Sequence, residues 1–310
     1  MPVISPELTM MDGFGIVIGL GFVLSCGYWC ADFLLVQLAL AAKDMQSSVE
    51  TPLVGAVAKL FFPALVVPPG LGAVALHMHG LATRYDLALP TLLGRYYSHG
   101  LLGLGITAML ASFMSGMAGN ITAFNTVWTY DIYQAYLVPD HSDRHYLMVG
   151  RVTTLVETVL SIATAYIALS FNNLMDLVQL LFSFFNAPLF AIFLLGMFTE
   201  WATPWGGFWG LLAGVLASLG HYLAYHSRLL RYGSEMSANF YGAIFAWGVC
   251  MVVTTVVSIF THRKAPEELA ELVHRREPGR AREHKAWMRW AWVFAGGIAA
   301  VCIVLNYLFF

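Results

Sequence analysis

Residues Ser112–Tyr133, with the sequence SFMSGMAGNITAFNTVWTYDIY, determine how the rest of the chain is interpreted. The stretch belongs to a hydrophobic segment long enough to cross a bilayer, yet small and polar side chains occur throughout it. These residues are Ser112, Ser115, Gly116, Gly119, Asn120, Thr122, Asn125, Thr126 and Thr129. Such polar groups are unfavourable against lipid, and small residues let another backbone approach closely. We therefore expect this helix to face protein, water or an ion.

The composition is that of an all-α polytopic membrane protein. The 310-residue chain is 59% hydrophobic and only 11% charged, with a mean hydropathy of +0.69. Soluble domains contain about 25% charged residues. Apolar runs long enough to span a bilayer as helices recur along the chain, and they predict about eight transmembrane helices. The predicted spans are 13–41, 52–77, 99–132, 146–170, 174–198, 206–226, 239–261 and 287–309.

Several function classes are disfavoured. The net charge of −2 and the lack of a basic patch with aromatic residues give no indication of nucleic-acid binding. The four cysteines lie inside apolar spans, where small buried hydrophobic residues are a better interpretation than a disulfide or metal framework. No nucleophile and base converge in the sequence, so we do not expect an enzyme.

The basic residues predict the orientation. If the loops after the first, third, fifth and seventh spans are cytoplasmic, most Lys and Arg residues lie on that side, many of them in the basic loop 262–286. That loop is predicted to hold a short amphipathic helix. Both termini then face outside, and residues 1–12 form a short extracellular lead. An even number of spans with both ends outside predicts that the sequence is the carboxyl-terminal part of a larger protein.

The end of the first span contains Tyr28, Trp29 and Asp32 within an apolar run. The two aromatic rings are consistent with an interfacial belt. They are equally consistent with a helix broken near Gly27, which would place the rings at membrane depth beside a cavity. An aspartate in this environment is costly unless it is paired or wetted.

Lys59 lies near the start of the second span and has two interpretations. Its ammonium group could reach the cytoplasmic interface along its apolar stem. Alternatively, it could donate a hydrogen bond to a polar solute. Pro63 and the Pro68-Pro69-Gly70 stretch are expected to interrupt the same helix.

Asp176 and Gln179 are three positions apart on the fifth span and share one helix face. Asp176 is near the outer end, where it could cap or solvate the helix terminus. Gln179 lies deeper. Its amide could bind a hydroxyl of a solute such as a sugar, or it could hydrogen-bond to a neighbouring helix, and both interpretations stay open on these residues alone.

Three motifs in order resemble a known family. The first is Tyr28–Asp32 (YWCAD), which continues through Gln37 to Lys43. The second is the Met114–Tyr133 helix, which ends in TYDIY. The third is Ala187–Phe198 (APLFAIFLLGMF), followed by GGFWGL at 206–211. Together, over most of residues 13–226, they resemble the sodium:solute symporter family, and within it the sodium/glucose-type cotransporters.

The resemblance implies a leucine-transporter-type fold of two inverted five-helix repeats plus accessory helices. Residues 13–200 would be the second repeat, with half of the solute and sodium sites, and residues 201–310 would be three accessory helices. The amino-terminal repeat would be the missing partner. The implied function is sodium-coupled symport of a monosaccharide across the cell membrane by alternating access. Alternatives are a same-fold symporter for an amino acid or carboxylate, or a signalling or scaffold module without transport.

The resemblance also implies roles for individual residues. Tyr28 falls on an inner-gate tyrosine, and Ser25, Lys59 and Gln179 fall on sugar-binding positions. Ser115 would ligate sodium through its hydroxyl and Ser112 through its carbonyl, with sodium a transported ion rather than a prosthetic group; oxygen ligands suit this hard cation. Asp32, Asp131 and Asp176 would have structural or gating roles.

The sequence also departs from the family pattern. Gly116 replaces a second hydroxyl residue of the sodium site, Phe33 replaces a Gln, and Leu38 replaces an Arg. Gly116, Gly119 and Asn120 are therefore expected to serve helix packing.

Overall fold

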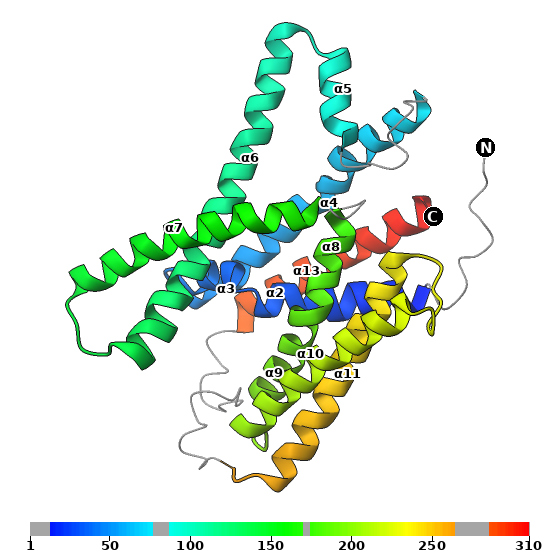
Figure 1. The fold of residues 1–310 in the computed structure, drawn as a ribbon. Helices are drawn as coiled ribbons and strands as arrows, with labels where there is room; N and C mark the ends of the chain where they lie inside the picture. The colour runs from blue at the N-terminus through cyan, green and yellow to red at the C-terminus, as the bar shows by residue number, and fades with distance from the viewer. Residues whose placement is uncertain (1–12, 77–86, 170–173, 264–284, 310) are drawn as a thin grey trace. The chain divides into compact units, whose positions relative to one another are not determined.

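A computed structural model describes residues 13–76, 87–169, 174–263 and 285–309, and these residues form helices without a β-strand (Figure 1). The predicted lead 1–12 and most of the basic loop 262–286 lie outside the described residues. The chain divides into two compact units. Unit 1 takes its described residues from Met1–Asp32 and Met175–Lys285, and unit 2 from Phe33–Leu174 and Ala286–Phe310. The predicted boundary between 13–200 and 201–310 stays a prediction.

Within the described residues, six helical stretches are long and apolar enough to cross a membrane. They are Gln46–Ala75, His99–Leu137, Asp143–Ala168, Leu174–Phe198, Pro204–His226 and Glu235–Phe260. The first and last predicted spans correspond to the shorter apolar stretches Gly15–Ala31 and Trp290–Val301. The all-α polytopic membrane class is thereby confirmed.

Unit 1 is built around an antiparallel helix pair, α10 (Pro204–His226) and α11 (Glu235–Phe260), which run side by side (Figure 1). On α10, buried Gly206, Gly210 and Gly214 recur every four residues along one face. Opposite them, α11 presents Ser258, Thr254 and Cys250 at the same spacing. The three glycines of α10 have no side chain and the facing residues of α11 have small ones, so the two helix backbones can lie close together.

Helix η1 (Gly15–Cys26) lies against α11 in the core of unit 1. It is wound as a π-helix, which is wider than an α-helix. Gly19 crosses Phe240 so closely that a Cβ atom there would lie 2.7 Å from the Phe240 carbonyl oxygen. Val23 and Leu24 are fully buried with residues of α11 and of α9 (Ala187–Phe198). This packing fixes the amino-terminal helix of the unit.

The predicted first span, 13–41, is not one helix. After η1, the short helix α2 (Gly27–Ala31) ends at Asp32, whose backbone is extended with φ −72° and ψ 118°, and α3 (Phe33–Leu40) follows. A broken helix was one of the two interpretations of this segment, but the break lies at Asp32 rather than at Gly27. Gly27 instead packs against Phe190, with 3.0 Å between its hypothetical Cβ and the Phe190 Cβ.

Unit 2 contains a helical hairpin and shorter packing elements. Helix α6 (His99–Thr126) continues into the π-helix η3 (Val127–Leu137), and the chain returns as α7 (Asp143–Ala168), which crosses and contacts both (Figure 1). Helix α5 (Ala88–Tyr96) contacts α6 through Leu93, which meets Gly105. Helix α3 contacts α6 through Leu34, which meets Gly119. Helix α13 (Lys285–Phe309) completes the described part of this unit.

Helix α4 (Met45–Ala75) corrects one expectation. Its backbone stays helical through Pro52, Pro63, Pro68 and Pro69, so the prolines do not interrupt it as predicted. Proline removes one backbone donor and crowds the preceding turn, which more often bends a membrane helix than ends it. The helix also begins at Met45, about two turns before the predicted start of the second span at 52.

The start of α4 gives a pH-dependent prediction. The Asp44 carboxylate accepts a hydrogen bond from the Ser47 N–H (2.7 Å), and this bond holds the Asp44 pKa below its ordinary value. Because the native pKa is lowered, the stabilising cap is complete above the unfolded value of about 3.9 and is lost as the pH falls through the lower native value. Hydrogen exchange should therefore show a protected Ser47 amide at pH ~5, with the protection lost only as the pH falls below the unfolded value of about 3.9.

Two variants control this experiment. Asp44→Asn keeps a good N-cap without a titrating group and should keep Ser47 protected across the pH range. Asp44→Ala should leave Ser47 unprotected at every pH. A protection profile of Asp44→Asn that still falls with acid would assign the pH dependence to another group.

Candidate solute and sodium sites

Unit 1 brings two of the predicted solute-binding residues onto adjoining helices. The Tyr28 ring of α2 stacks on Phe182, with 5.6 Å between centroids and 23° between planes. Phe182 begins η4 (Phe182–Asn186), three positions after Gln179 on α8 (Leu174–Leu181), so both side chains point to the same side of this segment. Ser25 lies one turn before Tyr28 and is exposed. The amide comes from α8, the phenol ring from α2 and the serine from the end of η1, which continues directly into α2.

Gln179 is buried, and one of its side-chain atoms lacks a hydrogen-bond partner within the part of the chain that the structure describes. Its side chain is 8% exposed, yet its Oε1 atom has no hydrogen-bond donor among the described residues. Buried acceptors are nearly always paired, and leaving one unpaired costs about 1–3 kcal/mol. The interpretation in which Gln179 bonds to a neighbouring helix therefore gains no support for this oxygen. The oxygen is thus a buried acceptor whose hydrogen-bonding capacity is unused among the described residues.

Asn186 was not assigned a role in the sequence analysis, although it lies beside Pro188 in an apolar stretch. Its Nδ2 donates to the Leu24 carbonyl oxygen (3.1 Å), close to the junction of η1 with α2. This bond ties the segment that carries Ser25 and Tyr28 to the segment that carries Gln179. A polar residue within an apolar run was the signal that could have identified it.

The sodium candidates belong to unit 2. Ser112 and Ser115 are exposed on α6, a helix on which no residue is buried within its unit. Gly116 has open space around its hypothetical Cβ, so its predicted packing role is not found among the described residues. Gly119 does pack, with 2.9 Å from its hypothetical Cβ to Leu34 Cδ1. Asn120 Nδ2 donates to the Gly116 carbonyl oxygen of its own helix (3.0 Å).

The remaining predicted residues are distributed between the units. Lys59 on α4 and Asp131 on η3 are exposed within unit 2. Asp32 is the half-buried residue at which α2 ends, and Asp176 is half-buried on α8. The Asp176 carbonyl oxygen accepts a hydrogen bond from Asn239 Nδ2 of α11 (3.1 Å), so its backbone helps to hold α8 in place.

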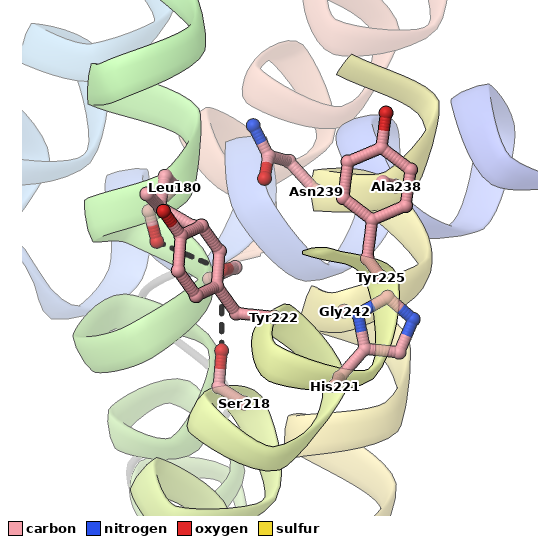
Figure 2. A pocket seen from close by; sticks show the side chains of 9 residues that line it. Leu180, Ser218, His221, Tyr222, Tyr225, Ala238, Asn239 and Gly242 are labelled. Atoms are coloured by element: carbon pink, nitrogen blue, oxygen red, sulfur yellow. Dashed lines mark hydrogen bonds between the residues drawn. The ribbon is translucent and has the colours of Figure 1, made fainter. Parts of the chain in front are cut away.

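A small polar cavity is lined in part by Leu180 and Ser183, which follow Gln179 in the chain, but it is not a solute site. Figure 2 shows it between α8, α10 and α11, where Ser218, His221, Tyr222 and Asn239 point toward it. Ser183 donates to the Leu180 carbonyl (2.7 Å) and exchanges a hydrogen bond with Ser218 (3.3 Å) at its edge. The cavity volume is about 10 Å³. Because that space suits a single water molecule, it cannot hold a sugar.

These features define a polytopic membrane protein in which polar groups gather on otherwise apolar helices. A model of the family described as "SSF: Sodium:solute symporter family" matches residues 8–214. That match covers more than half of the chain. The chain belongs to the sodium:solute symporter family, a family of transporters rather than enzymes.

Similar proteins agree with this assignment. The chain is 26% identical to the sodium/glucose cotransporter of Vibrio parahaemolyticus, over 65% of this chain and 40% of the relative. It is 28% identical to sodium/glucose cotransporter 1 of Sus scrofa, over 80% of this chain and 41% of the relative. It is 28% identical to sodium/myo-inositol cotransporter 2 of Rattus norvegicus, over 59% of this chain and 30% of the relative. The chain thus spans less than half the length of these relatives.

Proposed function

We propose that this chain is the solute- and sodium-binding half of a symporter that moves a monosaccharide with sodium by alternating access. The observation that carries the solute assignment is the buried Gln179 Oε1 atom, which lacks a donor among the described residues. A sugar hydroxyl supplies that donor. The amino-terminal repeat that completes the site would come from the rest of a longer protein.

The names of the relatives support a hydroxyl-rich solute. Glucose and myo-inositol are both rings that carry several hydroxyl groups, and both occur in those names. A ring of hydroxyls is both donor and acceptor, which suits an amide at Gln179 beside a serine hydroxyl at Ser25. An amino acid or carboxylate would instead need fixed charges to pair with its ionised groups.

Tyr28 is suited to gate such a solute. Its ring stacks on Phe182, and it lies on a five-residue helix that ends at the extended Asp32. The break at Asp32 separates the end of the helix that carries Tyr28 from α3, so that end can move without moving α3. Rotation of the Tyr28 ring off Phe182 would then open the path toward the cytoplasm. The ring stack is the contact that holds the gate closed.

The sodium half-site would use the Ser115 hydroxyl and the Ser112 carbonyl. Sodium drives transport only through a difference in its affinity for the outward and inward states, so its ligands must be complete in one state alone. Gly116 supplies no hydroxyl, but open space surrounds it. A water molecule or a ligand from the amino-terminal repeat can therefore take the place of the second hydroxyl.

Uptake of labelled glucose or galactose into proteoliposomes that hold the intact protein tests this function. We expect an inward sodium gradient to accelerate uptake. Ser115→Ala should raise the sodium concentration for half-maximal uptake by about 10- to 150-fold, because a bond to a charged group contributes about 1.5–3 kcal/mol. Gly116→Ser should lower that concentration, because the open space admits a further ligand oxygen.

Thr107→Ala is the matched control, since Thr107 lies on the same helix two turns earlier and its hydroxyl bonds to the Gly103 carbonyl. Its sodium response should equal that of the unmodified protein. An uptake rate that does not depend on the sodium gradient would show that transport is not coupled to sodium. Sodium-driven uptake of an amino acid or carboxylate in place of sugar would reassign the solute.

A further inference from the structure

A second polar cavity lies in unit 2, between the junction of α6 with η3 and the first turns of α7. Its volume is about 200 Å³. That is smaller than the 300–1,000 Å³ of sites for drug-sized ligands but holds several water molecules. Neither the solute residues nor the sodium residues proposed above line it. A ligand of this cavity would be a small group, bound apart from the residues proposed for the solute and for sodium.

The cavity walls are held by hydrogen bonds between the two sides of the hairpin. Thr129, which is 2% exposed, donates through Oγ1 to Asn125 Oδ1 (2.9 Å). Asn125 Nδ2 donates across the cavity to Thr154 Oγ1 on α7 (3.4 Å). Gly150 allows this approach, because a Cβ atom there would lie 3.1 Å from Asn125 Oδ1. The walls of the cavity are thus held in place by hydrogen bonds within the hairpin and between its two helices.

The threonine hydroxyls that line this cavity each donate a hydrogen bond to another group of the protein. Thr126 Oγ1 donates to the Thr122 carbonyl (2.8 Å), and Thr154 Oγ1 donates to the Gly150 carbonyl (2.9 Å). Thr129 donates to Asn125, as described above. Each of these oxygens keeps lone pairs. The cavity therefore offers the threonine oxygens as acceptors.

The donors come from two other residues that line the cavity, Arg151 and Tyr130. The Arg151 guanidinium carries five N–H groups and a permanent positive charge, and no carboxylate is among the described residues that line the cavity. Tyr130 adds a phenol, on a side chain that is 49% exposed. A planar guanidinium and a phenol that line the same cavity suit a phosphate group, which accepts bidentate hydrogen bonds. The ligand then needs both a phosphate and hydroxyl donors.

We propose that this cavity binds a hydroxyl-bearing phosphate ester of the glycerophosphate type. Its phosphate is bound by Arg151 and Tyr130, and its hydroxyl groups donate to the oxygens of Thr126 and Thr154. The hairpin end that holds the cavity is the one predicted to face the cytoplasm, where basic pockets between membrane helices meet anionic lipid headgroups. Arg151 lies eight residues into α7, and its long side chain can extend from there toward the headgroup region.

Native mass spectrometry of the intact protein in detergent tests the proposal with two ligands of the same headgroup chemistry. One is short-chain phosphatidylglycerol and the other is soluble glycerol phosphate, with phosphatidylcholine as the reference. We expect phosphatidylglycerol to bind at least tenfold more tightly than phosphatidylcholine. Binding of glycerol phosphate with equal affinity would identify a soluble metabolite as the source. Binding of phosphatidylglycerol alone would identify the bilayer. Equal binding of both phospholipids would overturn the proposal.

Three variants locate the binding. Arg151→Gln should lower phosphatidylglycerol affinity by about tenfold or more, because a charge-assisted bond is lost. Arg144→Gln removes a charge from the same helix outside the cavity and should change nothing. Thr126→Val keeps the shape but removes an acceptor oxygen, so it should weaken phosphatidylglycerol and leave phosphatidic acid, which lacks the second glycerol, unchanged. Equal affinities for the Arg151 and Arg144 variants would contradict the assignment.

Discussion

Replacing Gly210 with leucine is expected to destabilise the intact protein severely. A Cβ atom at this position would overlap Thr254 Oγ1 and lie 3.1 Å from the Cys250 carbonyl oxygen of α11. Overpacking of a close interface costs about 1–3 kcal/mol and occasionally more. We expect the melting temperature in detergent to fall by several degrees, at about 2–4 °C or less per kcal/mol for a chain of this size, with loss of the monodisperse peak in size-exclusion chromatography.

The cost is large because the obstacle is backbone as well as side chain. Thr254 could rotate its hydroxyl away, but the Cys250 carbonyl is fixed by the helix. Gly206 and Gly214 repeat the close approach one turn to either side, with Gly214 meeting Pro188 of α9 at 2.8 Å from its hypothetical Cβ. Leucine at the middle position would therefore separate α10 from α11 over three turns. In a membrane, this packing is the main force that associates helices.

Gly220→Leu is the matched control on the same helix. Nothing lies within 4 Å of its hypothetical Cβ. Leucine is a better helix former than glycine by about 0.8 kcal/mol, so this variant should keep or raise the melting temperature. A fall of similar size in both variants would show that glycine is needed for the helix backbone rather than for the interface between α10 and α11.

The membrane spans could be predicted from sequence because length and hydropathy decide them. Their ends are less visible. The predicted span 239–261 begins at Glu235 in the structure, because Ser234 caps the helix by accepting a hydrogen bond from the Ser237 N–H (3.1 Å). That polar first turn carries no apolar signal. The break at Asp32 was likewise hidden inside a continuous apolar run, since hydropathy does not report backbone angles.

The candidate sites show the same limit. The roles predicted for Ser25, Tyr28 and Gln179 follow from the resemblance. The burial of Gln179 and the lack of a donor at its Oε1 atom among the described residues are tertiary properties, which the spacing of residues in the sequence does not reveal. The predicted packing at Gly119 is confirmed by Leu34, whereas Gly116 faces open space. A glycine in a membrane helix indicates a possible close approach, and only the neighbouring element decides whether the approach occurs.

Substitution of Gln179 by methionine is expected to raise the KM for sugar uptake strongly without harming the empty protein. Methionine preserves the length of the side chain and removes its hydrogen-bonding atoms. The bound sugar then keeps a hydroxyl without its acceptor, at a cost of about 1–3 kcal/mol, or roughly a 5- to 150-fold increase in KM. The empty site no longer buries an unpaired oxygen, so the melting temperature should stay the same or rise.

Weaker sugar binding together with an unchanged or higher melting temperature distinguishes a binding role of Gln179 from a structural one. If Gln179 mainly held neighbouring helices together, the methionine variant would melt earlier, and transport would fall through loss of folded protein rather than through KM. Gln134→Met on η3 is the control, because it makes the same chemical change away from the proposed sugar residues, and it should leave KM unchanged. Sugar uptake by Gln179→Met with an unchanged KM would show that the buried amide does not contact the solute, and the solute site would then have to be sought on other residues.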